Sequence, residues 1–252
     1  MNTFSFSRLN LYQTCPRRFY YKYVLELDDP PGEAAILGKT VHKAIELVLN
    51  GRSFDDAVLT ACMEEAELML DKQEIERMVQ TAMNTLPMFP GKPTGIEQYF
   101  IETLTERAEI PTGMVMPETR VQGYMDLVYK NTASPIIVDW KTNRRPYPVN
   151  QTWQIPLYAS IIMEQEKTDT VEGVLVFLRT GQVFRQTITR DIADLAKNWA
   201  ANLAWEINLK LHHKTNPLIA FDSSPSAACG HCPWSYQCLL DDETKKIREV
   251  VL

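Results

Sequence analysis

The chain has 252 residues, of which 45% are apolar, 10% aromatic and 23% charged. These values are typical of soluble globular proteins, so the composition excludes a disordered chain, a collagen-like repeat and a coiled coil. The formal charge of −6 argues against a protein that coats nucleic acid without specificity. No secretory signal and no run of about 18 apolar residues occurs, so we expect a cytoplasmic protein without a membrane span. Its five cysteines are then reduced thiols or metal ligands.

Helical patterns fill most of the first 92 residues. Ser7 is the expected N-cap of a first helix that runs to about Tyr23. A second helix is expected over residues 36–51, where Gly51 ends it, and helical segments continue over residues 53–86.

After Pro93 the pattern changes to that of strands. Alternating or continuous apolar residues predict five of them, over residues 96–104, 119–130, 134–141, 171–178 and 182–190. Helices are expected over residues 150–166 and 191–213. Helices first, then a mixed central sheet flanked by helices, predict an α/β or α+β fold.

Two carboxylates and a lysine lie on neighbouring predicted strands. Asp139 and Lys141 are two residues apart, so they share one face of their strand while Trp140 points to the other. If the two strands pair as a hairpin, Asp126 approaches Asp139, and together they form an oxygen site for Mg²⁺ or Mn²⁺. A lysine beside such an ion can orient water and stabilise charge on a phosphate. An isolated D-x-K is more often a surface ion pair, and that interpretation stays open from the residues alone.

The spacing of four motifs resembles that of a known family. The motifs are Gly38-x3-His42, Gly123-Tyr124-Met125-Asp126, Asp139-Trp140-Lys141 and Gln154-x3-Tyr158. In order and spacing the segment is similar to the PD-(D/E)XK nuclease superfamily, and within it to the RecB-like exonucleases. The resemblance implies a restriction-endonuclease-like core that cuts DNA with Mg²⁺ or Mn²⁺.

The same resemblance implies roles for individual residues. His42, Asp126, Asp139 and the backbone carbonyl of Trp140 would be metal ligands, and Lys141 would be the catalytic lysine. Gln154 and Tyr158 would position the substrate or the lysine. On the residues alone, a histidine on an apolar helix is usually structural, and Tyr158 could belong to the core with its hydroxyl hydrogen-bonded. Glu97 and Glu102 both compete for one further metal-binding position.

Cysteines near the two ends of the sequence form a second motif. Cys229, Cys232 and Cys238 make a compact set that lacks one ligand, which Cys15 or Cys62 could supply. By ligand count, four thiolates suit Zn²⁺ and an iron–sulfur cluster equally. The segment around Cys15 resembles the N-terminus of RecB-like exonucleases with an iron–sulfur cluster, of the AddB and CRISPR-associated types. That resemblance implies a structural 4Fe–4S cluster on Cys15, Cys229, Cys232 and Cys238.

Two basic clusters are candidate contacts for DNA. Arg17, Arg18 and Lys22 alternate with aromatic residues, which suits single-stranded nucleic acid, and Arg144 and Arg145 follow the strand of Lys141. A helix with core aromatics and a solvated turn are the alternatives.

The resemblance to RecB-like exonucleases implies a metal-dependent DNA exonuclease that acts on single-stranded DNA ends. We expect one domain over residues 1–252, with an N-terminal helical part (1–92), a nuclease core (93–213) and a C-terminal cluster-binding segment (214–252). No G-x4-G-K-[S/T] motif occurs, so unwinding would come from a helicase or from a CRISPR or recombination partner. The alternatives are a noncatalytic DNA-binding or assembly subunit with the same fold and a zinc-stapled structural protein.

Overall fold

The computed structural model describes residues 1–65, 70–104, 118–130, 134–212 and 216–242. The chain divides into two compact units, and each is built from separated segments. The first unit comprises Met1–Pro30, Ile101–Gln122 and Asn198–Leu252, and the second comprises Pro31–Phe100 and Gly123–Lys197. The boundaries of these units differ from the three consecutive parts expected from the sequence, and the expectation that the chain forms one domain stays a prediction.

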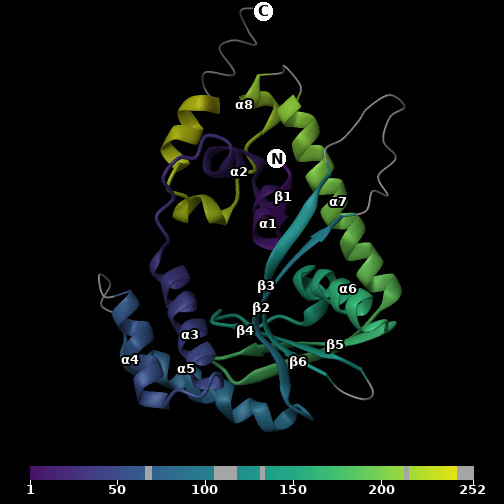
Figure 1. The fold of residues 1–252 in the computed structure, drawn as a ribbon. Helices are drawn as coiled ribbons and strands as arrows, with labels where there is room; N and C mark the ends of the chain where they lie inside the picture. Colours follow the sequence, from purple (N-terminus) through teal and green to yellow (C-terminus); the bar gives the residue numbers. More distant parts are fainter. Residues whose placement is uncertain (66–69, 105–117, 131–133, 213–215, 243–252) are drawn as a thin grey trace, which may run out of the picture. The chain divides into compact units, whose positions relative to one another are not determined.

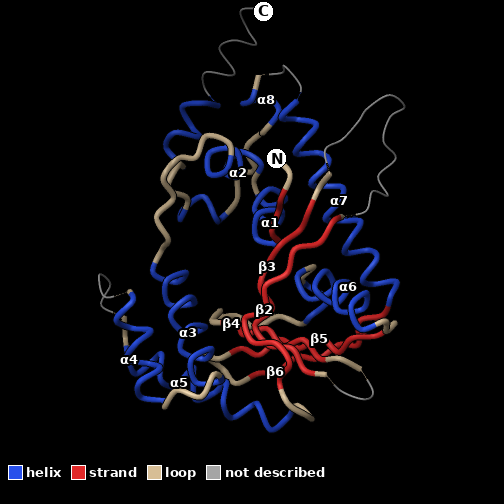
Figure 2. Tube along the Cα trace, viewed as in Figure 1, coloured by secondary structure: helices blue, strands red, loops and turns tan. Residues whose placement is uncertain are grey.

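Six strands of the described chain form one mixed sheet (Figures 1 and 2). They are β1 (Thr3–Ser5), β2 (Pro93–Thr103), β3 (Arg120–Tyr129), β4 (Ile136–Lys141), β5 (Thr170–Phe177) and β6 (Gln182–Thr189). The order is β1-β3-β4-β5-β6, and β2 also pairs with β3. β3 is antiparallel to β4, β4 is parallel to β5, and β5 and β6 form an antiparallel hairpin. The antiparallel pairing of β3 with β4, which was the condition for bringing Asp126 toward Asp139, is therefore present.

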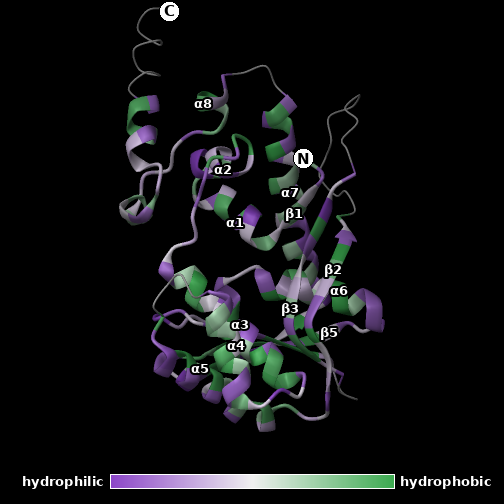
Figure 3. Cartoon of the chain, turned by 60° about the vertical axis from the view of Figure 1, so that its left-hand side comes forward, coloured by the Kyte–Doolittle hydropathy of each residue, from purple (hydrophilic) through white to green (hydrophobic). Residues whose placement is uncertain are grey.

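The helices follow the predicted order along the chain. They are α1 (Phe6–Thr14), α2 (Pro16–Tyr23), α3 (Glu33–Leu49), α4 (Phe54–Glu64), α5 (Lys72–Thr85), α6 (Gln154–Glu166), α7 (Arg190–His212) and α8 (Pro217–Ala220). α3, α4 and α5 carry both apolar and polar residues (Figure 3), as helices that cover one face of a sheet do.

The core of the second unit fixes which helices cover which face of the sheet. Val41 and Ile45 of α3 belong to one buried cluster with Val138 and Trp140 of β4. α6 packs on the opposite face. A Cβ placed on Gly173 of β5 would lie 2.3 Å from Cγ2 of Ile155, the second residue of α6. Because Asp139 and Lys141 alternate with Val138 and Trp140, their side chains leave β4 on the α6 side.

The N-terminal segment differs from its prediction in two ways. The expected single helix from Ser7 is broken at Cys15, which has an extended backbone and is followed by Pro16 at the start of α2. The N-cap is Ser5, whose side chain accepts the Arg8 N–H, and Ser7 lies inside α1. Residues 3–5 also form the short strand β1, parallel to β3, which the sequence did not indicate.

The predicted fold class is confirmed, because the structure is a mixed α/β arrangement with an open sheet flanked by helices. None of the described helices combines the length and the apolar character that crossing a bilayer requires.

Candidate metal centre

The pairing of β3 with β4 brings two acidic side chains together. Leu127 pairs with Val138 in the antiparallel register, so Asp126 and Asp139 are the next residues along the two strands. Oδ2 of Asp126 accepts the backbone N–H of Trp140 at 2.7 Å, and both carboxylates are buried. The strand geometry anticipated from the sequence is therefore present.

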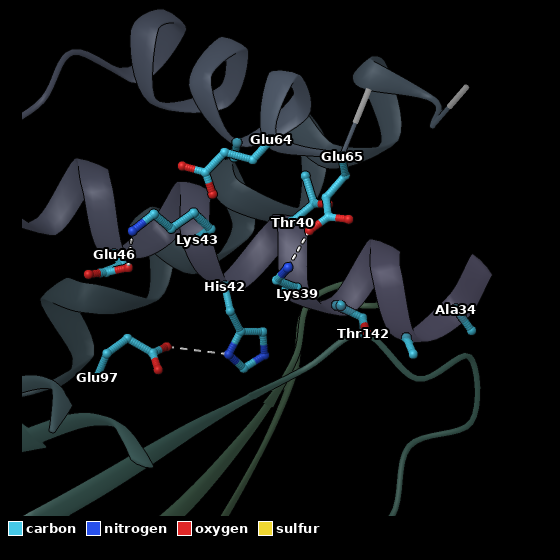
Figure 4. Close-up of a pocket in the computed structure, with 13 residues that line it drawn as sticks. Ala34, Lys39, Thr40, His42, Lys43, Glu46, Glu64, Glu65, Glu97 and Thr142 are labelled. Atoms are coloured by element: carbon cyan, nitrogen blue, oxygen red, sulfur yellow. Dashed lines mark hydrogen bonds and ion pairs between the residues drawn. The ribbon is translucent and has the colours of Figure 1, made fainter. Parts of the chain in front are cut away.

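A histidine and a second acidic residue join Asp126. His42 Nδ1 lies 3.5 Å from Oδ1 of Asp126 and 3.6 Å from Oε1 of Glu97. One ligand atom from each of these three residues lies within 4.8 Å of the other two, and the described residues contain no other such His, Cys, Asp and Glu group. Figure 4 shows the imidazole of His42 on α3 facing the carboxylate of Glu97. Nitrogen and carboxylate oxygens at this separation fit one divalent cation.

Of the two glutamates that the sequence leaves open, Glu97 is the one that the structure groups with His42 and Asp126. Glu97 has a φ of +46°, in the left-handed region, whereas strand residues normally have negative φ values. With this irregular backbone, the carboxylate of Glu97 lies beside His42. Glu102 is exposed and is not part of the three-residue group.

The other ring nitrogen of His42 contacts the backbone carbonyl of Trp140 at 3.1 Å. A histidine that donates one ring N–H to a carbonyl keeps its other nitrogen oriented toward a metal, as is common in metal sites. The carbonyl of Trp140 therefore orients His42 in this structure, and its predicted role as a metal ligand stays a prediction.

Burial and neighbouring charges shift the pKa values of His42, Asp126 and Asp139. Burial lowers the pKa of His42, but the charge of Asp126 and the contact with Glu97 outweigh it and hold this pKa well above its usual value. Burial raises the pKa of Asp126, and the neighbouring His42 and Lys141 lower it further than burial raises it. Burial, reinforced by the charge of Asp126, raises the pKa of Asp139 to about 6 although Lys141 opposes it. A bound cation stabilises several carboxylates that lie close together, because it offsets their mutual repulsion.

Lys141 is held by contacts from both sides. Its Nζ lies 2.6 Å from Oδ2 of Asp139, in an ion pair, and donates a hydrogen bond of 2.8 Å to Oε1 of Gln154. Gln154 is the first residue of α6, and its Nε2 lies 3.5 Å from the hydroxyl of Tyr158 one turn later. Burial lowers the pKa of Lys141, but the charge of Asp139 overcomes this, so the net pKa is raised and the ammonium is retained. The structure thus brings Lys141, Asp139 and Gln154 together, with Tyr158 at a longer distance.

A cavity of about 530 Å³ opens beside the histidine. Its lining includes His42, Glu97 and Thr142, which Figure 4 labels. Gly38 also lines it. A Cβ on Gly38 would lie 3.3 Å from Oγ1 of Thr142, so the glycine lets α3 approach the end of β4 closely. This volume lies within the range of ordinary ligand sites.

The cysteines lie in the first unit, with one exception. Cys15, Cys229, Cys232 and Cys238 all line one cavity of about 240 Å³. No three of them bring their sulfurs within 4.8 Å of one another in the described chain, so the thiols are not a compact cluster. Cys62 belongs to the second unit, where it packs against the apolar core.

Hydrogen bonds and burial shape the cysteine cavity. The backbone N–H of Ser226 donates to Sγ of Cys229 at 3.4 Å, and the N–H of Cys232 donates to the carbonyl of Cys229. Burial, followed by the charge of Asp242, raises the pKa of the Cys238 thiol to about 11. This thiol is therefore protonated at neutral pH unless a bound metal displaces the proton.

The structure corrects one of the predicted DNA contacts. The side chain of Arg17 is 0% exposed, and its guanidinium donates to the carbonyls of Phe221 and Leu218 and pairs with Asp242. It is therefore a structural residue and not a phosphate contact. Phe19 and Tyr21 of the same helix are also buried, which agrees with the core interpretation of these aromatics.

The remaining basic residues differ in their surroundings. Lys22 and Arg18 are partly exposed and face Asp29, and Lys22 forms the shorter ion pair. Arg144 and Arg145 are exposed after the end of β4. Their roles as DNA contacts stay predictions.

Comparison with known proteins agrees with this geometry. The model of the PD-(D/E)XK nuclease superfamily matches residues 3–239, so the chain belongs to that superfamily. Members are metal-dependent nucleases, which fits the His42, Glu97 and Asp126 group. No curated protein matches the chain. Among the solved structures that match is one described as the crystal structure of SSO0001, with 13% identity, a TM-score of 0.45, and coverage of 94% of this chain and 85% of that one.

Proposed function

We propose that this protein is a metal-dependent exonuclease that hydrolyses phosphodiester bonds at single-stranded DNA ends. The observation that carries the proposal is the group of His42, Glu97 and Asp126 beside a largely buried, charged Lys141. Bound Mg²⁺ or Mn²⁺ would neutralise charge on the phosphate and make water a better nucleophile. Within the superfamily, this donor set supports a hydrolase more than a binding subunit, because each expected kind of side chain is present.

The residues of the site would have different roles in metal binding and in catalysis. His42, Glu97 and Asp126 would hold the ion, because their ligand atoms converge. Asp139 and Gln154 orient Lys141 through contacts of 2.6 and 2.8 Å. The ammonium would then stabilise the negative charge that develops on the phosphate and align the attacking water. Asp139, which lies beside this group, would add a carboxylate to the ion or to its water shell.

The test is cleavage of end-labelled single-stranded DNA with Mg²⁺ or Mn²⁺, compared with Asp139→Ala and with a chelator. We expect the wild type to shorten the labelled strand progressively, and both the variant and the chelated protein to leave it intact. The protein is purified without oxygen so that loss of a cluster does not mimic inactivity. Folded wild type that binds DNA but never cuts it would refute the proposal and favour the noncatalytic subunit.

We further propose that Cys15, Cys229, Cys232 and Cys238 hold a structural 4Fe–4S cluster. Support comes from the single cavity that all four line. By ligand count, four thiolates suit Zn²⁺ equally, and the resemblance to exonucleases with an iron–sulfur cluster favours the cluster. The cluster would join positions 15 and 238 and so stabilise the first unit.

Metal analysis decides between the cluster and zinc. We expect about four iron atoms and matching acid-labile sulfide per chain, with visible absorption that reduction bleaches. One zinc per chain in colourless, folded protein would refute the cluster. The predicted helicase, CRISPR or recombination partner and the cytoplasmic location stay predictions.

A further inference from the structure

Two exposed tyrosines lie beside the candidate metal ligands. Tyr124 precedes Asp126 by two residues on β3, and Tyr99 follows Glu97 by two residues on β2. Their rings form a pair, with centroids 5.2 Å apart and planes inclined by 52°. Tyr99 is 49% exposed and Tyr124 is 56% exposed, so about half of the surface of each residue meets solvent.

This exposure is unusual for the aromatic residues of this chain. Within the ranges that the structure describes, only Tyr99, Tyr124 and Tyr236 are exposed aromatic side chains. The next residue of β2, Phe100, is buried and packs edge-on against Tyr158 at 5.0 Å. The core therefore takes Phe100 and leaves the tyrosine pair at the surface. Two of the three exposed rings lie beside the same site, which suggests that a ligand of that site uses them.

The position of the rings sets which part of a nucleic acid could reach them. Two residues along a strand span about 7 Å, which is the length of about two nucleotides at the duplex rise of 3.4 Å per strand. A base near the phosphate that is cut therefore comes within reach of Tyr124 or Tyr99. Inside a duplex both faces of a base stack on its neighbours, so a base away from a duplex end must be unpaired to place its face on a protein ring.

We propose that Tyr99 and Tyr124 form a stacking platform for an unpaired base, one or two nucleotides from the phosphate that is cut. The proposal rests on the proposed nuclease function and gives its preference for single strands a structural basis. Because the ring planes differ by 52°, one flat base can lie parallel to only one ring. We assign the base face to Tyr124, the more exposed ring, and the edge of the base to Tyr99.

The first test is binding of a labelled single-stranded oligonucleotide, compared with a blunt duplex of the same sequence. The measurements are made in a Lys141→Ala background so that DNA is not consumed. Removing a stacking ring typically weakens binding by roughly tenfold or more per base. We expect this loss for Tyr124→Ala on the single strand, a smaller loss for Tyr99→Ala, and little change on the duplex.

Matched variants separate stacking from other effects. Tyr124→Phe keeps the ring and should bind as tightly as the parent, since stacking does not need the hydroxyl. Leu195→Ala removes an exposed apolar side chain from α7 of the same unit and should leave binding unchanged. Equal losses for Tyr124→Ala and Leu195→Ala, or equal losses on single strand and duplex, would overturn the platform.

A scan with abasic sites identifies the stacked base. Oligonucleotides that each lack one base should show one or two positions where the parent protein loses roughly tenfold in affinity. At those positions Tyr124→Ala should show no further loss, because the ring and the base belong to the same interaction. A penalty that persists undiminished in Tyr124→Ala would show that the base contacts something else.

The two proposals fail in different ways. If wild type cuts DNA with Mg²⁺ or Mn²⁺ while the tyrosine variants bind like the parent, the platform is wrong and the nuclease proposal stands. If the abasic scan shows coupling between base and ring but wild type never cuts, the platform stands and the nuclease proposal is wrong.

Discussion

The hydrogen bond between Lys141 and Gln154 should control the rate of cleavage. Gln154→Ala removes the 2.8 Å acceptor on one side of the ammonium and leaves the Asp139 contact on the other. A hydrogen bond to a charged group is worth about 1.5–3 kcal/mol. If that orientation is fully expressed in the transition state, kcat falls roughly 10- to 150-fold. KM should change little, because Gln154 acts through Lys141 as a positioning residue and does not contact the substrate.

The neighbouring tyrosine provides an internal comparison. The distance between Gln154 and the Tyr158 hydroxyl is 3.5 Å, the long limit of a hydrogen bond, so Tyr158→Phe should lower kcat less than about threefold. Gln154→Glu keeps an oxygen acceptor for the ammonium and should retain more activity than Gln154→Ala. Gln182→Ala changes an exposed glutamine at the start of β6 and serves as the matched control.

The assay is single-turnover and steady-state cleavage of end-labelled single-stranded DNA, with a thermal melt of each variant. We expect the melting temperature of Gln154→Ala to stay close to that of wild type while kcat falls. A kcat within twofold of wild type would refute the orienting role of Gln154. A raised KM with normal kcat would instead make Gln154 a substrate contact.

Three further changes test other parts of the structure. Glu97→Gln should weaken activation by Mg²⁺ at least tenfold, while Glu102→Gln should leave it unchanged. The measurement is a titration of Mg²⁺ in the cleavage assay. Equal effects of the two substitutions would contradict the choice of Glu97. Gly173→Ala places a methyl group 2.3 Å from Ile155, and an overpacking cost of about 2 kcal/mol should lower the melting temperature by about 4–8 °C. Adding Ile155→Ala should relieve part of this loss. An unchanged melting temperature of Gly173→Ala would contradict the packing. Cys232→Ala should lose the bound iron and sulfide and melt at a lower temperature, and a stable variant with full iron content would contradict the ligand set.

The part of the site that the sequence predicts depends on regular backbone. The alternation of β-strands places Asp139 and Lys141 on one face, and the antiparallel hairpin brings Asp126 next to Asp139, so motif spacing alone anticipates both. Such geometry repeats in every strand and can be read from the chain without knowing any tertiary contact. The order of most helices and strands was predictable for the same reason.

The choice of Glu97 could not be made in this way. Its φ of +46° interrupts the strand pattern, and nothing local in a glutamate indicates a left-handed backbone. Backbone in that region is costly for a residue with a side chain and persists only where the surrounding structure imposes it. The cause therefore lies in tertiary contacts, which a sequence pattern does not contain.

Arg17 illustrates the same limit with the opposite result. Cations among aromatics fit both a DNA-binding helix and a helix with core aromatics. The guanidinium of Arg17 is buried and donates to the carbonyls of Leu218 and Phe221, about 200 residues along the chain. Once these carbonyls and Asp242 surround it, exposing the charge to a phosphate would leave buried acceptors unpaired. Tyr99 and Tyr124 are the opposite case. Aromatic residues in strands usually belong to a core, but the structure shows both tyrosines to be exposed, each two residues along its strand from a candidate metal ligand. Burial distinguishes the cations and rings that hold the fold together from those that can contact DNA. The alternation of a regular strand predicts which side chains are buried, but this prediction fails across an irregular residue such as Glu97.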